Sequence, residues 1–269
     1  MSNTETENIQ LTNQVAVVTG GGRGIGREIA LKFSKMGAKV AIAARTREQL
    51  DETVALIHQH GGQVLSFALD ITNQSAVEQM VKETTRQLGS VDILVNNAGA
   101  SGTETLLWKT NADDWWRVVE VNLRGPFLCA HAVLPGMIER QHGRIINVTS
   151  GVGAFPVPLN SCYPVSKAAL FRLTDCLAVM TQEHGVSVFA ISPGLVRTAM
   201  TQDMNIFKDV PDDEWSPIEQ AGDLCVFLAS GKADRLSGRY LTVRDNIPEL
   251  LKRADEIVEN DLYVLRLRK

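Results

Sequence analysis

Tyr163 and Lys167 stand four residues apart, at the start of a run of residues that favours a helix. Side chains at positions i and i+4 of a helix lie on one face, so this spacing places a phenol beside an ammonium group. A neighbouring cation favours the phenolate and should lower the pKa of Tyr163 from the usual value of about 10. Such a tyrosine can exchange a proton with an alcohol or carbonyl oxygen. Ser150, which closes the preceding apolar strand, can hydrogen-bond the same oxygen.

A tyrosine and a lysine with this spacing also occur as an exposed pair that contributes little, so other motifs must support the chemistry. The first is the glycine-rich turn after the apolar strand at residues 15–18. Residues 19–26 read T-G-G-G-R-G-I-G, which fits T-G-x-x-x-G-x-G and not the strict G-x-G-x-x-G pattern. Glycines between a strand and a helix let backbone N–H groups approach a pyrophosphate at the helix N-terminus. Gly20, Gly24 and Gly26 are therefore candidate cofactor ligands.

The end of the second strand, at residues 39–43, bears on the identity of the cofactor. An acidic residue just past this strand would bind a free ribose 2′-hydroxyl group, whereas an arginine would bind a 2′-phosphate. Positions 44–47 read A-R-T-R, the first acid is Glu48, and Arg23 in the glycine turn is a further cation. We expect NADP(H) in preference to NAD(H), with Arg45 at the phosphate. Alternatively, the arginines of this segment are solvated residues at a helix start.

Strands and helices alternate along most of the chain. Strands are expected at residues 15–18, 39–43, 64–69, 91–95, 144–148, 186–191 and 239–243, and the main further helices at 49–61, 77–88, 111–139, 218–229 and 247–258. This alternation predicts an α/β fold, a single-domain, Rossmann-like, doubly wound parallel sheet of about seven strands with helices on both faces. Ligands of such sheets lie at the C-terminal ends of the strands, where Asp70, Asn96 and Ser150 also fall.

One domain is expected, because the sequence has no linker, repeat or low-complexity segment. Residues 1–13 lack the basic start and apolar core of a signal peptide and are predicted to form a flexible N-terminal tail. Residues 14–243 should form the NAD(P)-binding catalytic domain. Within it, residues 199–217 mix apolar and acidic side chains, as expected of a lid over a partly apolar pocket. Residues 244–269 are predicted to be a helical extension packed on the same domain.

The long helix predicted at residues 111–139 contains a proline. Pro126 has no N–H group, so the carbonyl group of Asn122 loses its helical partner. We therefore expect a bend in this helix and an Asn122 carbonyl that is free to hold a water molecule. Trp115 and Trp116 on the same helix are interpreted as core or subunit-contact residues.

Composition excludes several classes of function. The chain of 269 residues is 44% hydrophobic and has a net charge of −4, so no global basic field recruits nucleic acid. The four cysteines are scattered and the five histidines form no ligand set, so no metal site is expected. No apolar run approaches the roughly 20 residues of a membrane-spanning helix. A reducing, cytoplasmic location is the expectation.

Taken together and in order, these motifs resemble the classical form of the short-chain dehydrogenase/reductase family, from about residue 14 to residue 243. The resemblance rests on T-G-x-x-x-G-I-G at 19–26, Asp70, N-N-A-G at 96–99, Asn122, Ser150, Tyr163-x-x-x-Lys167 and Pro193-Gly194. It implies a redox enzyme whose catalytic residues are Asn122, Ser150, Tyr163 and Lys167. It also implies cofactor contacts from Gly20, Arg23, Gly24, Ile25, Gly26, Arg45, Asp70, Ile71, Asn97, Ala98, Gly99, Tyr163, Lys167, Pro193, Gly194, Val196 and Thr198.

The resemblance further implies a mechanism. NADPH would pass a hydride to a carbonyl carbon while Ser150 hydrogen-bonds the oxygen and Tyr163 donates the proton. Lys167 would also hold the nicotinamide ribose, and Asn122 would orient a water molecule in a proton relay. By the same resemblance, Asp70 and Asn96 would border the adenosine side and residues 193–198 the nicotinamide amide.

Relatives of this family are commonly dimers or tetramers, so a homodimer or homotetramer is expected. The extra helix after residue 243 departs from the usual end of the family and puts its usual C-terminal subunit contact in doubt. It could instead seal the pocket of a neighbouring subunit or form a different interface.

The substrate is expected to be a medium-sized, rather apolar ketone, aldehyde or secondary alcohol, because the lid and residues 152–159 are largely apolar. The acids of the lid should repel anionic acyl-carrier protein or CoA; they are Asp203, Asp209, Asp212, Asp213 and Glu214. A basic patch of Arg124, Arg140 and Arg172 keeps a 3-oxoacyl thioester as an alternative. Two further alternatives are a non-catalytic protein that senses NADP, and a longer-chain epimerase or dehydratase relative. The complete set of catalytic residues argues against the first, and the glycine spacing and lack of a sizeable C-terminal domain argue against the second.

Overall fold

The computed structural model describes residues 9–202 and 204–267, and its centre is a parallel sheet of seven strands in the order β3-β2-β1-β4-β5-β6-β7. The strands are β1 (Val15–Thr19), β2 (Lys39–Ala44), β3 (Val64–Ala68), β4 (Ile93–Asn96), β5 (Gly143–Val148), β6 (Val186–Ser192) and β7 (Tyr240–Thr242). Strand order reverses between β1 and β4, and doubly wound sheets bind their ligands at such a switch point. The predicted fold class is confirmed.

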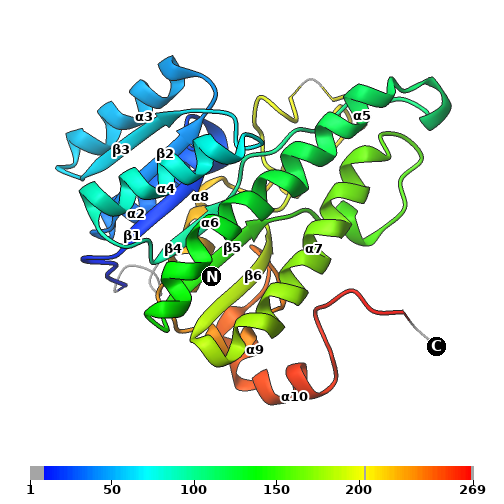
Figure 1. Cartoon of the computed structure of the whole chain (residues 1–269). Helices are drawn as coiled ribbons and strands as arrows, with labels where there is room; N and C mark the ends of the chain where they lie inside the picture. Colours follow the sequence, from blue (N-terminus) through cyan, green and yellow to red (C-terminus); the bar gives the residue numbers. More distant parts are fainter. Residues whose placement is uncertain (1–8, 203, 268–269) are drawn as a thin grey trace.

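Successive side chains of each strand point to opposite faces of the sheet, and this divides the hydrophobic core into two layers. In β1, Ala16 and Val18 belong to one layer, whereas Val15 and Val17 belong to the other. The first layer is covered by α2 (Gly24–Lys35), α3 (Arg47–Gln59) and α8 (Glu219–Ala229), and the second by α4 (Gln74–Leu88), α6 (Gly125–Glu139) and α7 (Cys162–Thr181). Figure 1 shows α4, α6 and α7 together on one side of the sheet. No helix within the described residues is long and apolar enough to cross a membrane.

The helix predicted at residues 111–139 is interrupted close to its proline. The segment α5 (Ala112–Val119) leads into a π-helical turn at Glu120–Arg124, and α6 follows with Pro126 in its first turn. The Gly125 N–H donates to the Glu120 carbonyl, five residues earlier, instead of the usual four. A π-turn lets a helix absorb a local misfit without ending. At the position of the predicted bend, the helix therefore has a widened π-helical turn. That the Asn122 carbonyl holds a water molecule stays a prediction.

The flexible tail predicted for residues 1–13 is wrong for its last part. Ile9 and Leu11 are buried in the first core layer, and the Leu11 N–H donates to the Met36 carbonyl at 2.7 Å. Two apolar side chains are enough to anchor this segment, because each gains free energy on leaving water. Residues 1–8 of the expected tail lie outside the described residues.

The C-terminal extension packs on the same domain, but as two short helices and not as the single helix predicted at 247–258. These are α9 (Ile247–Lys252) and α10 (Ala254–Glu259), and Arg253 separates them with φ of −106° and ψ of 17°. Ile247 and Ile257 are fully buried in the first core layer. Residues 261–267 then run back towards α7 (Figure 1).

Among its described residues, the segment expected to form a lid contains only two short helical elements, the 3₁₀ turns at Asn205–Phe207 and Asp212–Glu214. A β-bridge joins Leu195 to Trp215, so the segment leaves and returns at neighbouring points. Asp203, one of the acids expected in the lid, lies outside the described residues.

Candidate active site

The glycine-rich turn leaves β1 and packs against the loop after β4. The Thr19 hydroxyl accepts hydrogen bonds from the backbone N–H groups of Asn97 and Ala98, at 3.0 and 3.1 Å. The side-chain amide of Asn97 donates to the Thr19 carbonyl at 2.9 Å. Gly20 has a φ of +67°, and a Cβ atom there would come within 2.7 Å of Asn97 Nδ2. Glycine is therefore required at this close approach, which fixes the turn at the switch point between β1 and β4.

Arg23 and Arg45 are exposed on the rim of the cavity that this turn borders. In the part of the chain that the structure describes, neither guanidinium group pairs with a carboxylate. Arg47 instead donates to the Ser66 hydroxyl at 3.1 Å and lies 3.9 Å from Asp51, outside the cavity. Two guanidinium groups on one rim favour an anion between them. Of the two arginines that follow β2, Arg45 is thus the one that lines the cavity and could bind an anion there.

Asp70, two residues past β3, is held on the cavity wall by an arginine that the sequence did not single out. Its carboxylate accepts hydrogen bonds from the Thr72 N–H and hydroxyl, at 2.9 and 2.8 Å, and from the Arg117 guanidinium on α5. Partial burial acts to raise the pKa of Asp70, but the bonds from Thr72 and Arg117 hold that pKa below its usual value. Arg117 also lines the cavity. Nothing in the sequence around Arg117 marks its contact with Asp70, because the two residues are 47 positions apart.

Tyr163 and Lys167 lie one turn apart on α7 and border the same cavity. Lys167 Nζ is 5.5 Å from the centroid of the Tyr163 ring and donates to the Val148 carbonyl at 2.9 Å. The Ser150 side chain lies close enough to the Tyr163 hydroxyl to influence its pKa. The structure thus brings the three expected residues together, with the tyrosine at the cavity surface and the lysine buried behind it.

The pKa of Tyr163 departs from the expectation in sign. Burial raises the pKa of Tyr163 to about 12, and the nearby Ser150 side chain offsets only part of this rise. Burial also lowers the pKa of Lys167 to about 8. The prediction that the lysine lowers the tyrosine pKa is therefore wrong for the protein chain itself. Removing both charged forms from water costs more free energy than their attraction across this distance returns.

Asn122 is fully buried in the π-turn and does not line the cavity. Its side chain accepts a hydrogen bond from the Ala100 N–H at 2.8 Å and donates to the Ala100 carbonyl and the Ser166 hydroxyl, both at 2.9 Å. It therefore joins the loop after β4 to α7, three residues beyond Tyr163. With the amide fully engaged in these contacts, a part in the expected water relay falls to the backbone carbonyl.

One cavity of about 1170 Å³ connects the glycine turn with the tyrosine. The expected cofactor residues that line it are Gly20, Arg23, Gly24, Ile25, Gly26, Arg45, Asp70, Ile71, Asn97, Ala98, Gly99, Tyr163, Lys167, Pro193 and Thr198. Most of the predicted ligands are thus brought to one surface, although they come from five loops and from the helices α2 and α7.

Four expected parts of the site are not among the residues that line the cavity, and their contacts with cofactor or substrate stay predictions. Val196 is buried, and Gly194 packs against the Ser216 side chain, so neither lines the cavity. Asn96 is also buried, with its amide donating to Asn147 Oδ1 at 2.9 Å. The apolar wall expected at residues 152–159 is absent from the cavity lining as well. Val196, Gly194 and Asn96 each lie next to a residue that lines the cavity, whereas residues 152–159 do not.

The lid segment forms one wall of the cavity through the side chains Met200, Phe207, Val210 and Trp215, among others. The Arg197 guanidinium pairs with Asp212 and lies 4.8 Å from the centre of the Trp215 ring system. These contacts hold the two ends of the segment together.

A carboxylate from the opposite loop holds the tip of the lid. Glu104 accepts hydrogen bonds from the backbone N–H groups of Asn205 and Ile206, at 3.0 and 3.2 Å, and from the Asn205 side chain at 3.2 Å. Glu104 lies in the loop that follows β4, so this contact bridges the cavity from one side to the other. Sequence reasoning missed Glu104, since a single acid in a loop has no pattern around it.

The residues of this cavity fit a dinucleotide. Its volume exceeds the roughly 300–1,000 Å³ of sites that hold one drug-sized ligand. The glycine turn presents backbone N–H groups at the N-terminus of α2, where a pyrophosphate is stabilised. The rim carries two guanidinium groups, and the opposite end carries a phenol and an ammonium group. This arrangement offers an anion site and a proton donor within one enclosure.

Comparisons with known proteins agree with this geometry. A family model described as short chain dehydrogenase matches residues 14–209. A short chain dehydrogenase of Pseudocercospora fijiensis is 34% identical, over 96% of this chain and 90% of the relative. A 3-oxoacyl-[acyl-carrier-protein] reductase of Synechocystis sp. is 36% identical, over 83% of this chain and 92% of the relative. The crystal structure of levodione reductase superposes with a TM-score of 0.82 at 27% identity, over 87% of this chain and 96% of that one.

Proposed function

The chain is a member of the short-chain dehydrogenase/reductase family of oxidoreductases, and from this premise we propose that it interconverts a ketone or aldehyde and a secondary alcohol. The family uses NAD(P)(H), and we propose NADP(H) as the preferred cofactor. The observation that carries the proposed function is the single cavity shared by Tyr163, Lys167 and the glycine turn. A phenol next to a dinucleotide site can supply the proton that carbonyl reduction requires.

In this reaction the bound dinucleotide supplies the hydride to the carbonyl carbon, or accepts it from the alcohol carbon. Ser150 hydrogen-bonds the substrate oxygen, and the Tyr163 hydroxyl gives its proton to that oxygen during reduction. Lys167 stabilises the phenolate that remains, and the phenolate takes the proton back when an alcohol is oxidised. A pKa raised to about 12 keeps Tyr163 in its acid form at neutral pH, which suits reduction.

The cofactor side of the cavity supports NADP(H). Arg23 and Arg45 are two exposed cations of the cavity lining, and a ribose 2′-phosphate is an anion that would satisfy them. Asp70 is fixed by Thr72 and Arg117 with its carboxylate on the wall, where it can accept a hydrogen bond from the adenosine part. Nicotinamide would then lie at the opposite end, near Tyr163.

The substrate side of the cavity supports a medium-sized, rather apolar carbonyl compound. Met200, Phe207 and Trp215 supply most of the apolar surface of the lid wall. Such a wall favours an apolar substituent next to the carbonyl group. Asp209, Asp213 and Glu214 are exposed on the same segment and disfavour an anionic carrier.

A 3-oxoacyl thioester is the second candidate substrate, and the name of the Synechocystis relative favours it. The basic residues expected to dock an acyl carrier are engaged inside the chain. Arg140 donates to the Val91 carbonyl at 2.7 Å, and Arg172 donates to Asp175 at 2.9 Å. Arg124 donates to the Thr72 carbonyl at 3.0 Å. These contacts reduce the support for a docking patch and leave the medium-sized apolar carbonyl compound as the first choice.

A panel of carbonyl compounds with both cofactors tests the proposed function. NADPH oxidation should be fastest with medium-sized apolar ketones, slower with NADH, and slower again with acetoacetyl thioesters. A thioester that exceeds every free ketone in kcat/KM would establish the second candidate. NADPH binding without turnover on any carbonyl compound or alcohol would instead support a sensor.

We also propose that the protein acts in the cytoplasm as a homodimer or homotetramer, since enzymes of this family commonly oligomerise. Light scattering on the purified chain measures the number of subunits directly. Fractionation of cells that express the tagged chain tests the location.

A further inference from the structure

The face of α7 that carries the proposed acid–base pair continues along the helix. Tyr163, Lys167, Phe171 and Asp175 follow one another at intervals of four residues, so they lie along one side of α7. Tyr163 and Lys167 border the large cavity, whereas Phe171 and Asp175 border a second, small cavity of about 140 Å³. The C-terminal segment at residues 263–265 supplies the outer wall of that small cavity.

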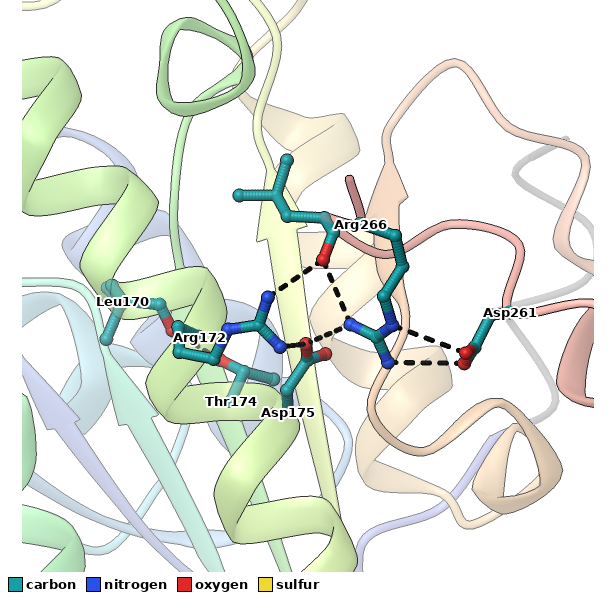
Figure 2. Close-up of polar contacts among 7 residues, drawn as sticks. Leu170, Arg172, Thr174, Asp175, Asp261 and Arg266 are labelled. Atoms are coloured by element: carbon teal, nitrogen blue, oxygen red, sulfur yellow. Dashed lines mark hydrogen bonds and ion pairs between the residues drawn. The ribbon is translucent and has the colours of Figure 1, made fainter. Parts of the chain in front are cut away.

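Asp175 is the point at which the C-terminal segment is tied to α7. Its carboxylate accepts hydrogen bonds from Arg172 at 2.9 Å and from Arg266 at 2.7 Å, and only 12% of its side chain is exposed. Both guanidinium groups also donate to the Leu265 carbonyl, at 2.9 and 3.0 Å. Figure 2 shows the two arginines meeting at Asp175, with Asp261 on the far side of Arg266. The network therefore joins a helix and a segment that are 91 residues apart.

The backbone of the same segment is joined to the edge of the sheet. The Tyr240 N–H, in β7, donates to the Tyr263 carbonyl at 2.8 Å. Asp261 and Tyr263 have φ values of 51° and 60°, a left-handed conformation that costs residues other than glycine free energy. The segment keeps this conformation because the contacts at Tyr240 and Asp175 outweigh that cost. It is thus held at both ends and is not a loose terminus.

The small cavity connects this segment with the turn that carries Ser150. Phe171 packs edge to face on Tyr240, with 4.7 Å between the ring centroids. The 3₁₀ turn Gly151–Ala154 follows Ser150 directly, and Ala154 lines the small cavity. A Cβ atom on Gly153 would come within 2.7 Å of the Phe171 ring, so the turn lies tightly against α7. Phe171 therefore contacts the Ser150 turn on one side and Tyr240 on the other.

On the basis of the function proposed above, we propose that residues 261–267 form a strap that positions Tyr163 and Ser150 for proton transfer. The strap fixes α7 through Asp175 and fixes the Ser150 turn through Tyr240 and Phe171. None of residues 261–267 lines the large cavity, so they are positioning residues. Loss of the strap should change the alignment of Tyr163 with Ser150 while the glycine turn, on the far side of β5 and β4, keeps its structure.

Three variants test the strap. Deletion of residues 261–269 removes it, Arg266→Ala breaks the tie to Asp175, and Arg266→Lys retains one charged contact. Arg253→Ala is the matched control, since its ion pair with Glu256 stays within the extension and does not reach α7. We expect the deletion to lower kcat for ketone reduction by roughly tenfold, because small misalignments of reacting groups are costly. Arg266→Ala should lower it less, and Arg266→Lys should recover part of the loss.

The dissociation constant for NADPH, measured by its fluorescence, should change less than twofold in every variant by the same alignment argument. Hydrogen exchange should become faster in α7 and in residues 151–154 after deletion and in Arg266→Ala, and should stay unchanged in Arg253→Ala. Equal kcat and equal exchange in Arg266→Ala and Arg253→Ala would overturn the strap. If the unaltered chain reduces no ketone, the proposed function fails, and the exchange measurement still decides whether the strap exists.

Discussion

At Tyr163, the effects of burial and of a neighbouring cation act in opposite directions on one group. Burial is the larger and raises the pKa of the phenol to about 12, while the same burial lowers the pKa of Lys167 to about 8. The chain by itself therefore holds Tyr163 as a neutral acid. The lysine matters most once the phenol has given up its proton, because it then faces a charge of opposite sign.

The rate of reduction should depend on pH through these two groups. The neutral phenol persists through neutral pH, so kcat/KM for ketone reduction should stay level up to pH of about 8. Above this pH Lys167 loses the proton that stabilises the phenolate, and kcat/KM for reduction should fall. Alcohol oxidation needs the phenolate and should rise with pH up to about 8, where Lys167 still carries its proton. Rate profiles in both directions measure this, and a reduction rate that rises steadily from neutral to alkaline pH would contradict it.

Arg45 should decide between the two cofactors. Hydrogen bonds to charged groups contribute about 1.5–3 kcal/mol, so Arg45→Asp should reduce the preference for NADPH over NADH by roughly 10- to 100-fold. The ratio of kcat/KM for the two cofactors measures this preference. Arg47→Asp is the matched control, since Arg47 contacts Ser66 and Asp51 outside the cavity. Equal changes of the ratio in both variants would mean that the charge acts only at long range.

Among the elements, the loop after β4 and α7 are joined by one buried amide. Asn122→Ala would leave the Ala100 N–H, the Ala100 carbonyl and the Ser166 hydroxyl without this partner. Buried polar groups without partners are costly, so the free energy of unfolding should fall by about 2–3 kcal/mol. Urea denaturation measures the change.

Asn73→Ala serves as the comparison for that variant. Asn73 caps α4 through an exposed hydrogen bond to the Ala76 N–H at 3.1 Å, and losing such a cap costs about 1 kcal/mol. An Asn122 variant no less stable than the Asn73 variant would argue against the joining role.

The lid is closed by Glu104, which gives a prediction of its own. Glu104→Ala removes the acceptor for three donors at the tip of the lid, so NADPH should dissociate roughly fivefold faster. Glu104→Gln keeps one acceptor oxygen, so its NADPH dissociation rate should lie between those of Glu104→Ala and the unaltered chain. Stopped-flow fluorescence gives the rate constant. A dissociation rate equal to that of Glu78→Ala, an exposed residue on α4, would show that the contact does not hold the lid.

At the scale of the whole molecule, the fold and the grouping of Ser150, Tyr163 and Lys167 could be predicted because their determinants are local. A few consecutive residues are enough to recognise each strand or helix, the glycine turn, and the i, i+4 spacing of Tyr163 and Lys167. The right-handed crossover rule then places their ends on one edge of the sheet. The sheet order and the shared cavity follow from these few facts.

The features that the sequence missed depend on contacts between distant segments. Arg117 meets Asp70, and Glu104 meets Asn205, only after the sheet has formed, and neither residue stands in a pattern. Burial of Leu11 depends on a core that periodicity in a short segment does not reveal. The sign of the Tyr163 pKa shift likewise depends on burial, which spacing along a helix does not specify.

The most direct measurement is a single turnover of Tyr163→Phe mixed with NADPH and a ketone that the unaltered chain reduces. The general acid typically contributes 10²- to 10⁴-fold, so NADPH oxidation should slow by roughly that factor. The NADPH dissociation constant should stay unchanged, because the phenyl ring still fills the same wall. Tyr263→Phe, which keeps the backbone carbonyl used by Tyr240, should react at the normal rate. A Tyr163→Phe variant that oxidises NADPH as fast as the unaltered chain would contradict the assignment of Tyr163 as the proton donor.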